Sequence, residues 1–293
     1  MGLAKRLAAA LLLLAGLAGP VTATPSAVVD LVQAPAWVER GGVRKPLQPG
    51  LSLENHDRLV TGAGARAIVQ MADGSAVKFG ENASVAVNAL GQREGGVFTA
   101  ALDVARGAFR LTTDIFRRFQ SQRAINVRVG TVTIGIRGTD LWGRTDAERD
   151  FVCLLEGRIA VTHPLADAVL LDSPLQFYGA DKGKAPGPVA VAEREQLAKW
   201  ALETEPVAGA GMQRQGGRWA LRVAVLESEG EALAWLDRLA AAGYGAKVLP
   251  QRAAGGYRYE LRLGSIPGED EANLLADRMA RDMAIPRPTV IGR

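Results

Sequence analysis

The sequence predicts a mainly β N-terminal domain, either an antiparallel sandwich or a barrel, followed by a small α+β C-terminal domain. Residues 27–161 consist of short apolar runs separated by Gly, Asp and Asn, and they show little helical periodicity. Beyond residue 217 the pattern changes, because strand-like runs alternate there with two amphipathic helical stretches. A chain of 293 residues is long enough to form two modest hydrophobic cores.

The first 23 residues are predicted to be a signal peptide. Lys5 and Arg6 give a short basic start, residues 7–17 are rich in Ala and Leu, and Val21-Thr22-Ala23 supplies the small residues that a signal peptidase reads. The apolar run is too short to span a bilayer comfortably. We therefore expect a secreted, periplasmic protein with no transmembrane segment after signal cleavage. An uncleaved anchor is the alternative interpretation.

Charge and side-chain chemistry argue against several functions. The formal net charge is +4, and two of these units lie on Lys5 and Arg6, so we expect no nucleic-acid partner for the mature chain. Cys153 is the single cysteine and lies in an apolar run, which predicts a buried side chain and no intramolecular disulfide. His56 and His163 stand far apart, and no nucleophile elbow, phosphate loop or dinucleotide fingerprint is present. We expect no metal, no cofactor and no enzymatic activity.

The first domain shows clear hairpin and strand signals. A hairpin is predicted where the apolar residues 65–69 and 76–79 flank Asp73-Gly74, because this pair tolerates a positive φ. Further along, residues 131–136 alternate between apolar and small or polar side chains. This alternation predicts a strand with one apolar face.

The alternation ends at Arg137-Gly138-Thr139-Asp140. Burying a charged side chain beside an apolar strand costs free energy unless the charge is paired. Two parallel hydrogen bonds from an arginine to a carboxylate provide such a pair. Arg137 and Asp140 are therefore predicted to form a structural pair that fixes the exit of the strand. Recognition of a partner by the same two side chains is the alternative.

Residues 27–163 resemble the FecR domain, a module of bacterial envelopes. The strand that ends in Arg137-Gly138-Thr139-Asp140 looks like the family signature, and further landmarks occur in order along the chain. These landmarks are Asp57-Arg58, Thr61-Gly62, Asp73-Gly74-Ser75, Gly80-Glu81-Asn82, Arg106-Gly107-Ala108-Phe109-Arg110 and Glu156-Gly157-Arg158-Ile159. From this resemblance we expect a β-rich envelope module that meets an envelope protein partner.

Residues 164–206 are predicted to be an extended segment followed by a helix. The helical spacing covers residues 191–205, and Pro206 stops the helix. One face of this helix carries Leu197, Trp200 and Ala201. We expect that face to pack on the first domain. Residues 207–217 contain four glycines and are predicted to be a flexible linker.

Residues 218–293 are predicted to fold in the order β-α-β-β-α-β, a ferredoxin-like arrangement with both helices on one side of an antiparallel sheet. Ser228 is placed to cap the first helix, with Glu231 three residues on. The side chains predicted to face the helices are Leu221, Val223, Val225, Tyr257, Tyr259, Leu261 and Leu263. The free face of the sheet then carries Arg222, Arg258, Glu260 and Arg262, with Trp219 at the edge of the first strand.

This C-terminal part resembles the SPOR domain, a peptidoglycan-binding module of bacterial envelopes. The matching residues are Trp219, Ala232 to Gly243-Tyr244, Leu263-Gly264-Ser265, and Glu271-Ala272 to Met279-Ala280. The resemblance implies binding, on the free sheet face, of denuded glycan strands, from which the stem peptides have been removed. The predicted glycan-binding residues are Arg222, Arg258, Glu260, Arg262 and Trp219. A guanidinium group pairs directly with the lactyl carboxylates that such strands expose.

Together these features predict a non-enzymatic periplasmic protein. Its SPOR-like domain is expected to bind peptidoglycan and its FecR-like domain a protein partner, so that the protein acts as an envelope scaffold. Cell division is the process in which we expect such targeting, with enrichment at the division site. The alternative is a periplasmic sensory or regulatory component of a FecR-type signalling system that does not bind glycan.

Overall fold

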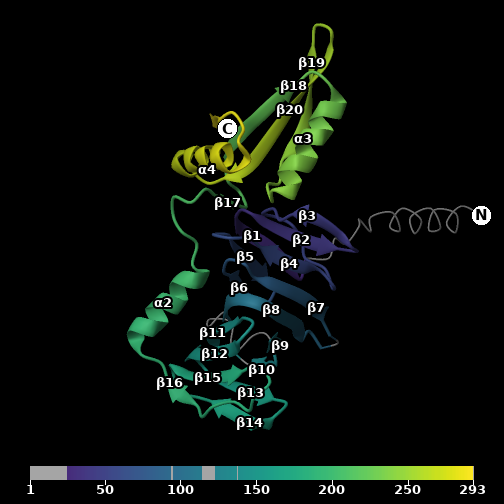
Figure 1. Cartoon of the computed structure of the whole chain (residues 1–293). Coiled ribbons are helices and arrows are strands. Elements are labelled where there is room, and N and C mark those ends of the chain that lie inside the picture. The colour runs from purple at the N-terminus through teal and green to yellow at the C-terminus, as the bar shows by residue number, and fades with distance from the viewer. Residues whose placement is uncertain (1–24, 94, 114–122, 137, 293) are drawn as a thin grey trace, which may run out of the picture.

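The computed structural model describes residues 25–93, 95–113, 123–136 and 138–292 (Figure 1). The predicted signal peptide and Arg137 lie outside these residues. The predicted fold class is confirmed: a large β-rich domain precedes a smaller domain with the order β-α-β-β-α-β. No helix within the described ranges has the length and apolar character needed to cross a membrane.

Two sheets build the first domain. Sheet A runs in the order β17 (Met212–Arg214), β1 (Ala27–Gln33), β5 (Arg66–Met71), β6 (Ala76–Phe79), β8 (Phe98–Thr112), β11 (Asp140–Thr145), β12 (Arg149–Glu156), β15 (Gln176–Asp181) and β16 (Ala190–Val191). Sheet B runs in the order β3 (Val43–Pro46), β2 (Ala36–Arg40), β4 (Arg58–Thr61), β7 (Ser84–Gln92), β8, β9 (Arg123–Val129), β10 (Val132–Ile136), β13 (Ile159–His163) and β14 (Ala166–Leu171). All of these pairings are antiparallel except that of β8 with β9, which is parallel.

The long strand β8 belongs to both sheets. Its first part pairs with β7 and β9 in sheet B, and its last part pairs with β6 and β11 in sheet A. The change of sheet falls at Gly107, which has a φ of 93°. A Cβ atom at this position would lie 2.5 Å from the Cα atom of Ala83. Only glycine combines this backbone angle with such a close approach of a neighbouring chain.

The core of the first domain lies between sheets A and B. Alternation along the strands supplies it, because every second side chain of a strand points to the same face. In β10, Val132, Ile134 and Ile136 are at most 2% exposed, whereas Thr133 between them is exposed. Burial of each such side chain contributes about 1.5–3 kcal/mol. The apolar face predicted for this strand is therefore one wall of the core.

The helix α2 (Arg194–Thr204) runs along the outer face of sheet A (Figure 1). Its Trp200 ring stacks on the ring of Trp142 in β11, with centroids 4.8 Å apart and planes 9° from parallel. The two rings belong to a small second core on this face, together with Ala108, Cys153 and Phe177. Cys153 is buried there, as its apolar run predicts, and burial raises the pKa of its thiol to about 12.

The C-terminal domain is built from β18 (Trp219–Leu226), α3 (Glu229–Ala241), β19 (Lys247–Ala253), β20 (Gly256–Ile266), α4 (Glu269–Met283) and β21 (Thr289–Gly292). The strands form an antiparallel sheet, here called sheet C, in the order β19-β20-β18-β21. Side chains of both helices, such as Leu239 and Leu275, share one core with this sheet. Both helices therefore cover the same face and leave the other face free. The N–H of Glu231 donates to Ser228 Oγ at 3.3 Å, so the predicted helix cap is present.

The segment between the domains is held by hydrogen bonds. Strand β17 lies within residues 207–217, which were expected to form a flexible linker, and it pairs with the edge of sheet A. The Glu271 carboxylate, in the first turn of α4, accepts the N–H groups of Gly209, Gly211 and Met212 at 2.6, 2.7 and 2.9 Å. Trp37 Nε1 donates to the carbonyl of Ala240 at 3.0 Å, which joins β2 directly to α3. These contacts fix the C-terminal domain on one end of the β domain.

Candidate functional site

The free face of sheet C carries most of the predicted site residues. Residues that oppose each other across an antiparallel pair project to the same face. Lys247, Arg262 and Arg222 form one such row across β19, β20 and β18. Leu249, Glu260 and Val225 form the next row. We call the surface made by these two rows and the neighbouring Arg258 and Gln251 the outer face of sheet C.

Glu260 lies at the centre of the outer face and is only 1% exposed. Its Oε1 accepts hydrogen bonds from Arg262 Nε at 2.7 Å and is 2.5 Å from Arg262 Nη2. Its Oε2 accepts from Gln251 Nε2 at 2.7 Å and lies 3.2 Å from Arg222 Nε. Burial alone would raise the pKa of Glu260, but the hydrogen bonds from Arg262 and Gln251 and the charges of Arg262 and Arg222 outweigh it and lower the pKa. Glu260 therefore stays ionised and orders the two arginines.

The two remaining predicted residues lie away from this cluster. Arg258 lies nearer the tip of the β19–β20 hairpin, and its Nε is 3.1 Å from a carboxylate oxygen of the exposed Glu227. Trp219 is half-buried and packs against the core of the C-terminal domain, with its ring beside Gly292 of β21. The structure thus brings Arg222, Glu260 and Arg262 together and leaves Trp219 supporting the core.

Two residues expected to pack beneath the helices are exposed instead. A β-bulge between Arg222 and Ala224 inserts one residue into β18 relative to β20, so the alternation shifts along the strand. Val225 consequently lies on the outer face and is 45% exposed, while Ala224 packs against the core. Tyr257 is 53% exposed, because the β19–β20 hairpin projects beyond α3 at this point (Figure 1).

The outer face is basic and offers preorganised donors. Lys247, Arg222, Arg258 and Arg262 carry positive charge, and only Glu260 and Glu227 among their described contacts oppose it. Arg222 remains 42% exposed and Arg258 55% exposed, so both keep donors accessible to solvent. A guanidinium group held in place by a buried carboxylate loses little side-chain entropy when it binds an anion. The arrangement suits carboxylate groups on a polar polymer.

Loss of the Glu260 charge is expected to lower stability in a pH-dependent way. Glu260→Gln should reduce the free energy of unfolding at pH 7 by about 1–3 kcal/mol, since charge-assisted hydrogen bonds to a buried carboxylate are lost. The folded-state pKa of Glu260 lies below its unfolded value, so its contribution is present above the unfolded value of about 4.3 and is lost as pH falls through the folded pKa. Urea denaturation between pH 7 and 3 should therefore show the difference between parent and variant shrinking.

Glu227→Gln is the matched control for this experiment. Glu227 also pairs with an arginine of the same surface, but its side chain is 73% exposed. Its replacement should change the free energy of unfolding by no more than about 0.5 kcal/mol. An equal effect of the two substitutions would contradict the central role of Glu260.

Of the two residues predicted to pair, Arg137 and Asp140, the structure describes Asp140. Asp140 accepts two hydrogen bonds from Arg110 of β8, from Nε at 3.0 Å and from Nη2 at 2.7 Å. Arg110 Nη1 also reaches Glu205 at the end of α2, at 3.2 Å. Its contact with Asp140, above all, raises the pKa of Arg110. Arg137 lies outside the described residues, so its pairing stays a prediction. Arg110 was missed as a partner, although it belongs to a family landmark.

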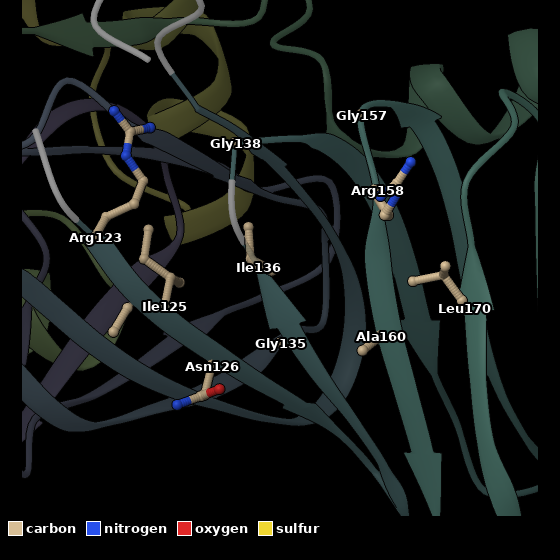
Figure 2. Close-up of a pocket in the computed structure, with 11 residues that line it drawn as sticks. Arg123, Ile125, Asn126, Gly135, Ile136, Gly138, Gly157, Arg158, Ala160 and Leu170 are labelled. Carbon is tan, nitrogen blue, oxygen red and sulfur yellow. The ribbon is translucent and has the colours of Figure 1, made fainter. Parts of the chain in front are cut away.

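A hollow of about 840 Å³ opens on the outer face of sheet B (Figure 2). Small residues of three neighbouring strands line it, namely Ala124, Gly135 and Ala160. Among the described residues, a Cβ atom at Gly135 would have only Asn126 within 4 Å, so the space that they leave above this glycine is open. Figure 2 shows Asn126, Arg158 and Leu170 around it, the last of which is 52% exposed. Among the described residues that line this hollow, Arg123 and Arg158 are charged, and the others are apolar or uncharged polar residues.

The fold defines a two-domain protein in which a β-sandwich precedes a ferredoxin-like domain with a basic free sheet face. The family model of the FecR protein matches residues 57–160, and that of the SPOR domain matches residues 215–292. The chain is thus a FecR-domain protein with a C-terminal SPOR domain. Both are non-catalytic families, and both are typical of envelope proteins.

No curated protein matches the sequence. Two crystal structures of a candidate anti-sigma factor from Parabacteroides distasonis, at 1.65 and 2.50 Å resolution, are similar in fold, each with 12% sequence identity and a TM-score of 0.40. The alignments cover 80% of this chain and 99% and 98% of the two solved chains.

Proposed function

We propose that this protein is a periplasmic, non-enzymatic scaffold that binds denuded glycan strands of peptidoglycan on the outer face of sheet C. The observation that carries the proposal is the cluster of Arg222 and Arg262 around the buried carboxylate of Glu260. A SPOR domain implies peptidoglycan binding, and the cluster supplies the cations for it. Denuded strands offer lactyl carboxylates to such cations and hydroxyl groups to the remaining donors.

Binding would combine charge with preorganisation. Glu260, Gln251 and the sheet hold the guanidinium groups before a ligand arrives, so that little ordering entropy remains to be lost. Leu249 and Val225 flank the cluster and offer apolar surface to the less polar faces of sugar rings. Because the charges are partly exposed, binding should weaken as ionic strength rises.

The FecR domain is proposed to supply the protein-partner surface. The hollow above Gly135 supports this role, since it combines exposed Leu170 with the polar groups of Asn126 and Arg158. In this arrangement the SPOR domain places the protein on denuded peptidoglycan, and the FecR domain recruits or stiffens an envelope assembly. Cell division, in which such peptidoglycan forms, is the process we propose.

Sedimentation with amidase-treated sacculi tests the proposal. The double variant Arg222→Ala, Arg258→Ala should bind at least about tenfold more weakly than the parent, because two contacts to charged ligand groups are removed. Arg262 and Gln251 still hold Glu260 in this variant, so the fold should persist. Arg281→Ala is the matched control, since Arg281 lies on α4, which covers the opposite face of sheet C, and is 72% exposed. Equal binding by parent and double variant would show that the outer face is not the site.

The FecR match favours a second candidate function, that of a periplasmic sensory or regulatory component in a FecR-type signalling system. In that case the C-terminal domain has the SPOR fold but does not bind glycan strands. The same experiment separates the two candidates. A parent protein that stays in solution with both untreated and amidase-treated sacculi would favour the regulatory role over the scaffold.

A further inference from the structure

One end of the outer face of sheet C meets the first domain and forms a hollow of about 150 Å³ there. Both domains contribute to its walls. Gln48 and Pro49 follow β3, and Gln213 lies in β17 of sheet A. The residues of sheet C that line the hollow are Lys247, Leu249, Arg262, Gly264 and Ser265. Lys247, Leu249 and Arg262 belong to the outer face already described, so the hollow continues that surface.

The wall from the first domain is fixed in place. Gln213 is 3% exposed, its backbone pairs with Val32 of β1, and its Nε2 donates to the carbonyl of Gly264 at 2.7 Å. The side chain of Gln48 lies so close to Gly245 that a Cβ atom there would be 2.4 Å from it. Two further contacts hold the domains in this arrangement. Trp37 donates a hydrogen bond to Ala240, and Glu271 accepts the backbone N–H groups of Gly211 and Met212. In Figure 1, β17 accordingly lies at the base of the C-terminal domain.

The floor of the hollow is open because Gly264 has no side chain. Gly264 follows Arg262 by two positions in β20 and therefore belongs to the outer face. A Cβ atom at Gly264 would meet no atom within 4 Å. The volume is smaller than that of pockets for drug-sized ligands, about 300–1,000 Å³, and suits a group the size of one sugar ring. Two cations, amide groups and a short apolar surface surround this space.

From this arrangement we infer that the hollow is a terminal subsite, in which the end of a denuded glycan strand binds between the two domains. The inference rests on the proposed function and makes it more specific. Gln48, Pro49 and Gln213 stand across the path of a strand lying along β20, so the strand ends there. Lys247 and Arg262 would receive a carboxylate of the terminal sugar, and the half-buried amide of Gln48 its hydroxyl or acetamido groups. The FecR domain then takes part in glycan recognition.

Filling the hollow tests this inference. Gly264→Leu places a side chain in open space, and the φ of Gly264 lies outside the left-handed region, so the fold should persist. Affinities for a denuded tetrasaccharide and for long denuded strands are measured on the full chain by calorimetry. Gly264→Leu should weaken tetrasaccharide binding about tenfold, which corresponds to the loss of one well-made charged contact. Gln48→Ala, which removes one wall amide, should weaken it in the same direction.

Gly91→Leu is the matched control, because Gly91 of β7 also has open space around its Cβ position and lies in the first domain. This variant should bind as the parent does. At equal total sugar, the parent should also bind more tetrasaccharide than long strands, since the short ligand offers more ends. A parent that binds long strands in proportion to their sugar content, with Gly264→Leu unaffected, would overturn the terminal subsite and leave the proposed function standing. A parent that binds neither ligand would overturn both.

Discussion

Trp142→Ala is expected to lower the free energy of unfolding of this protein by about 3–5 kcal/mol, the range typical of a buried tryptophan replaced by alanine. Trp142 is 1% exposed and stacks on Trp200, so the substitution leaves a cavity between sheet A and α2. The other fully buried residues of this small core, Ala108, Cys153 and Ala192, have side chains too short to fill the space. Urea denaturation followed by far-UV circular dichroism measures the loss.

The control for this prediction lies on the same helix. Leu202 of α2 is 69% exposed, so Leu202→Ala should change the free energy of unfolding by no more than about 0.5 kcal/mol. Trp200→Ala removes the other half of the stack and should resemble Trp142→Ala in direction, with a smaller effect because Trp200 is half-buried. A loss below about 1 kcal/mol for Trp142→Ala would mean that α2 is not anchored through this stack.

Gly107→Ala is expected to cost about 2–4 kcal/mol, because backbone strain and overpacking each contribute about 1–3 kcal/mol. The strain arises from the φ of 93°, and the overpacking from the Ala83 Cα atom, 2.5 Å from the new Cβ. Ala83 is buried and cannot move aside without disturbing the core. The effect should appear as a lower urea midpoint with an unchanged dependence on denaturant.

Gly91→Ala is the control, because it is expected not to lower the free energy of unfolding. Gly91 lies in β7, its φ is outside the left-handed region, and no atom of the described residues would come within 4 Å of its Cβ. The substitution should be neutral or stabilise by up to about 1 kcal/mol, because it reduces the conformational entropy of the unfolded chain. Equal destabilisation by both substitutions would contradict the special role of the position where β8 changes sheets.

Much of the fold could be predicted because its signals are local. The alternation of residues 131–136, the turn at Asp73-Gly74 and the cap at Ser228 each depend on neighbouring residues, and each appears in the structure. The strand β17 could not be predicted in the same way. It is a short glycine-flanked segment that becomes a strand only because the edge of β1 offers it backbone partners.

The candidate site was predictable in its composition but not in its detail. Period-two alternation placed Arg222, Glu260 and Arg262 on one face, and the structure brings them together. The bulge in β18 then moved Val225 to that face, because an added residue reverses the alternation beyond it. Burial of Glu260 was also not predictable, since it depends on side chains from three strands closing around one carboxylate.

The division into two parts, their fold class and the family landmarks can be read from the amino-acid sequence, because period-two and helical patterns and turn residues act over short distances along the chain. Which charged side chains meet depends instead on how the elements pack. Asp140 pairs with Arg110 because the distant strands β8 and β11 are neighbours in sheet A. Gln213 of sheet A reaches the carbonyl of Gly264 because the two domains pack against each other. Pairing of this kind depends on register and on packing between elements, which single-sequence periodicity does not encode.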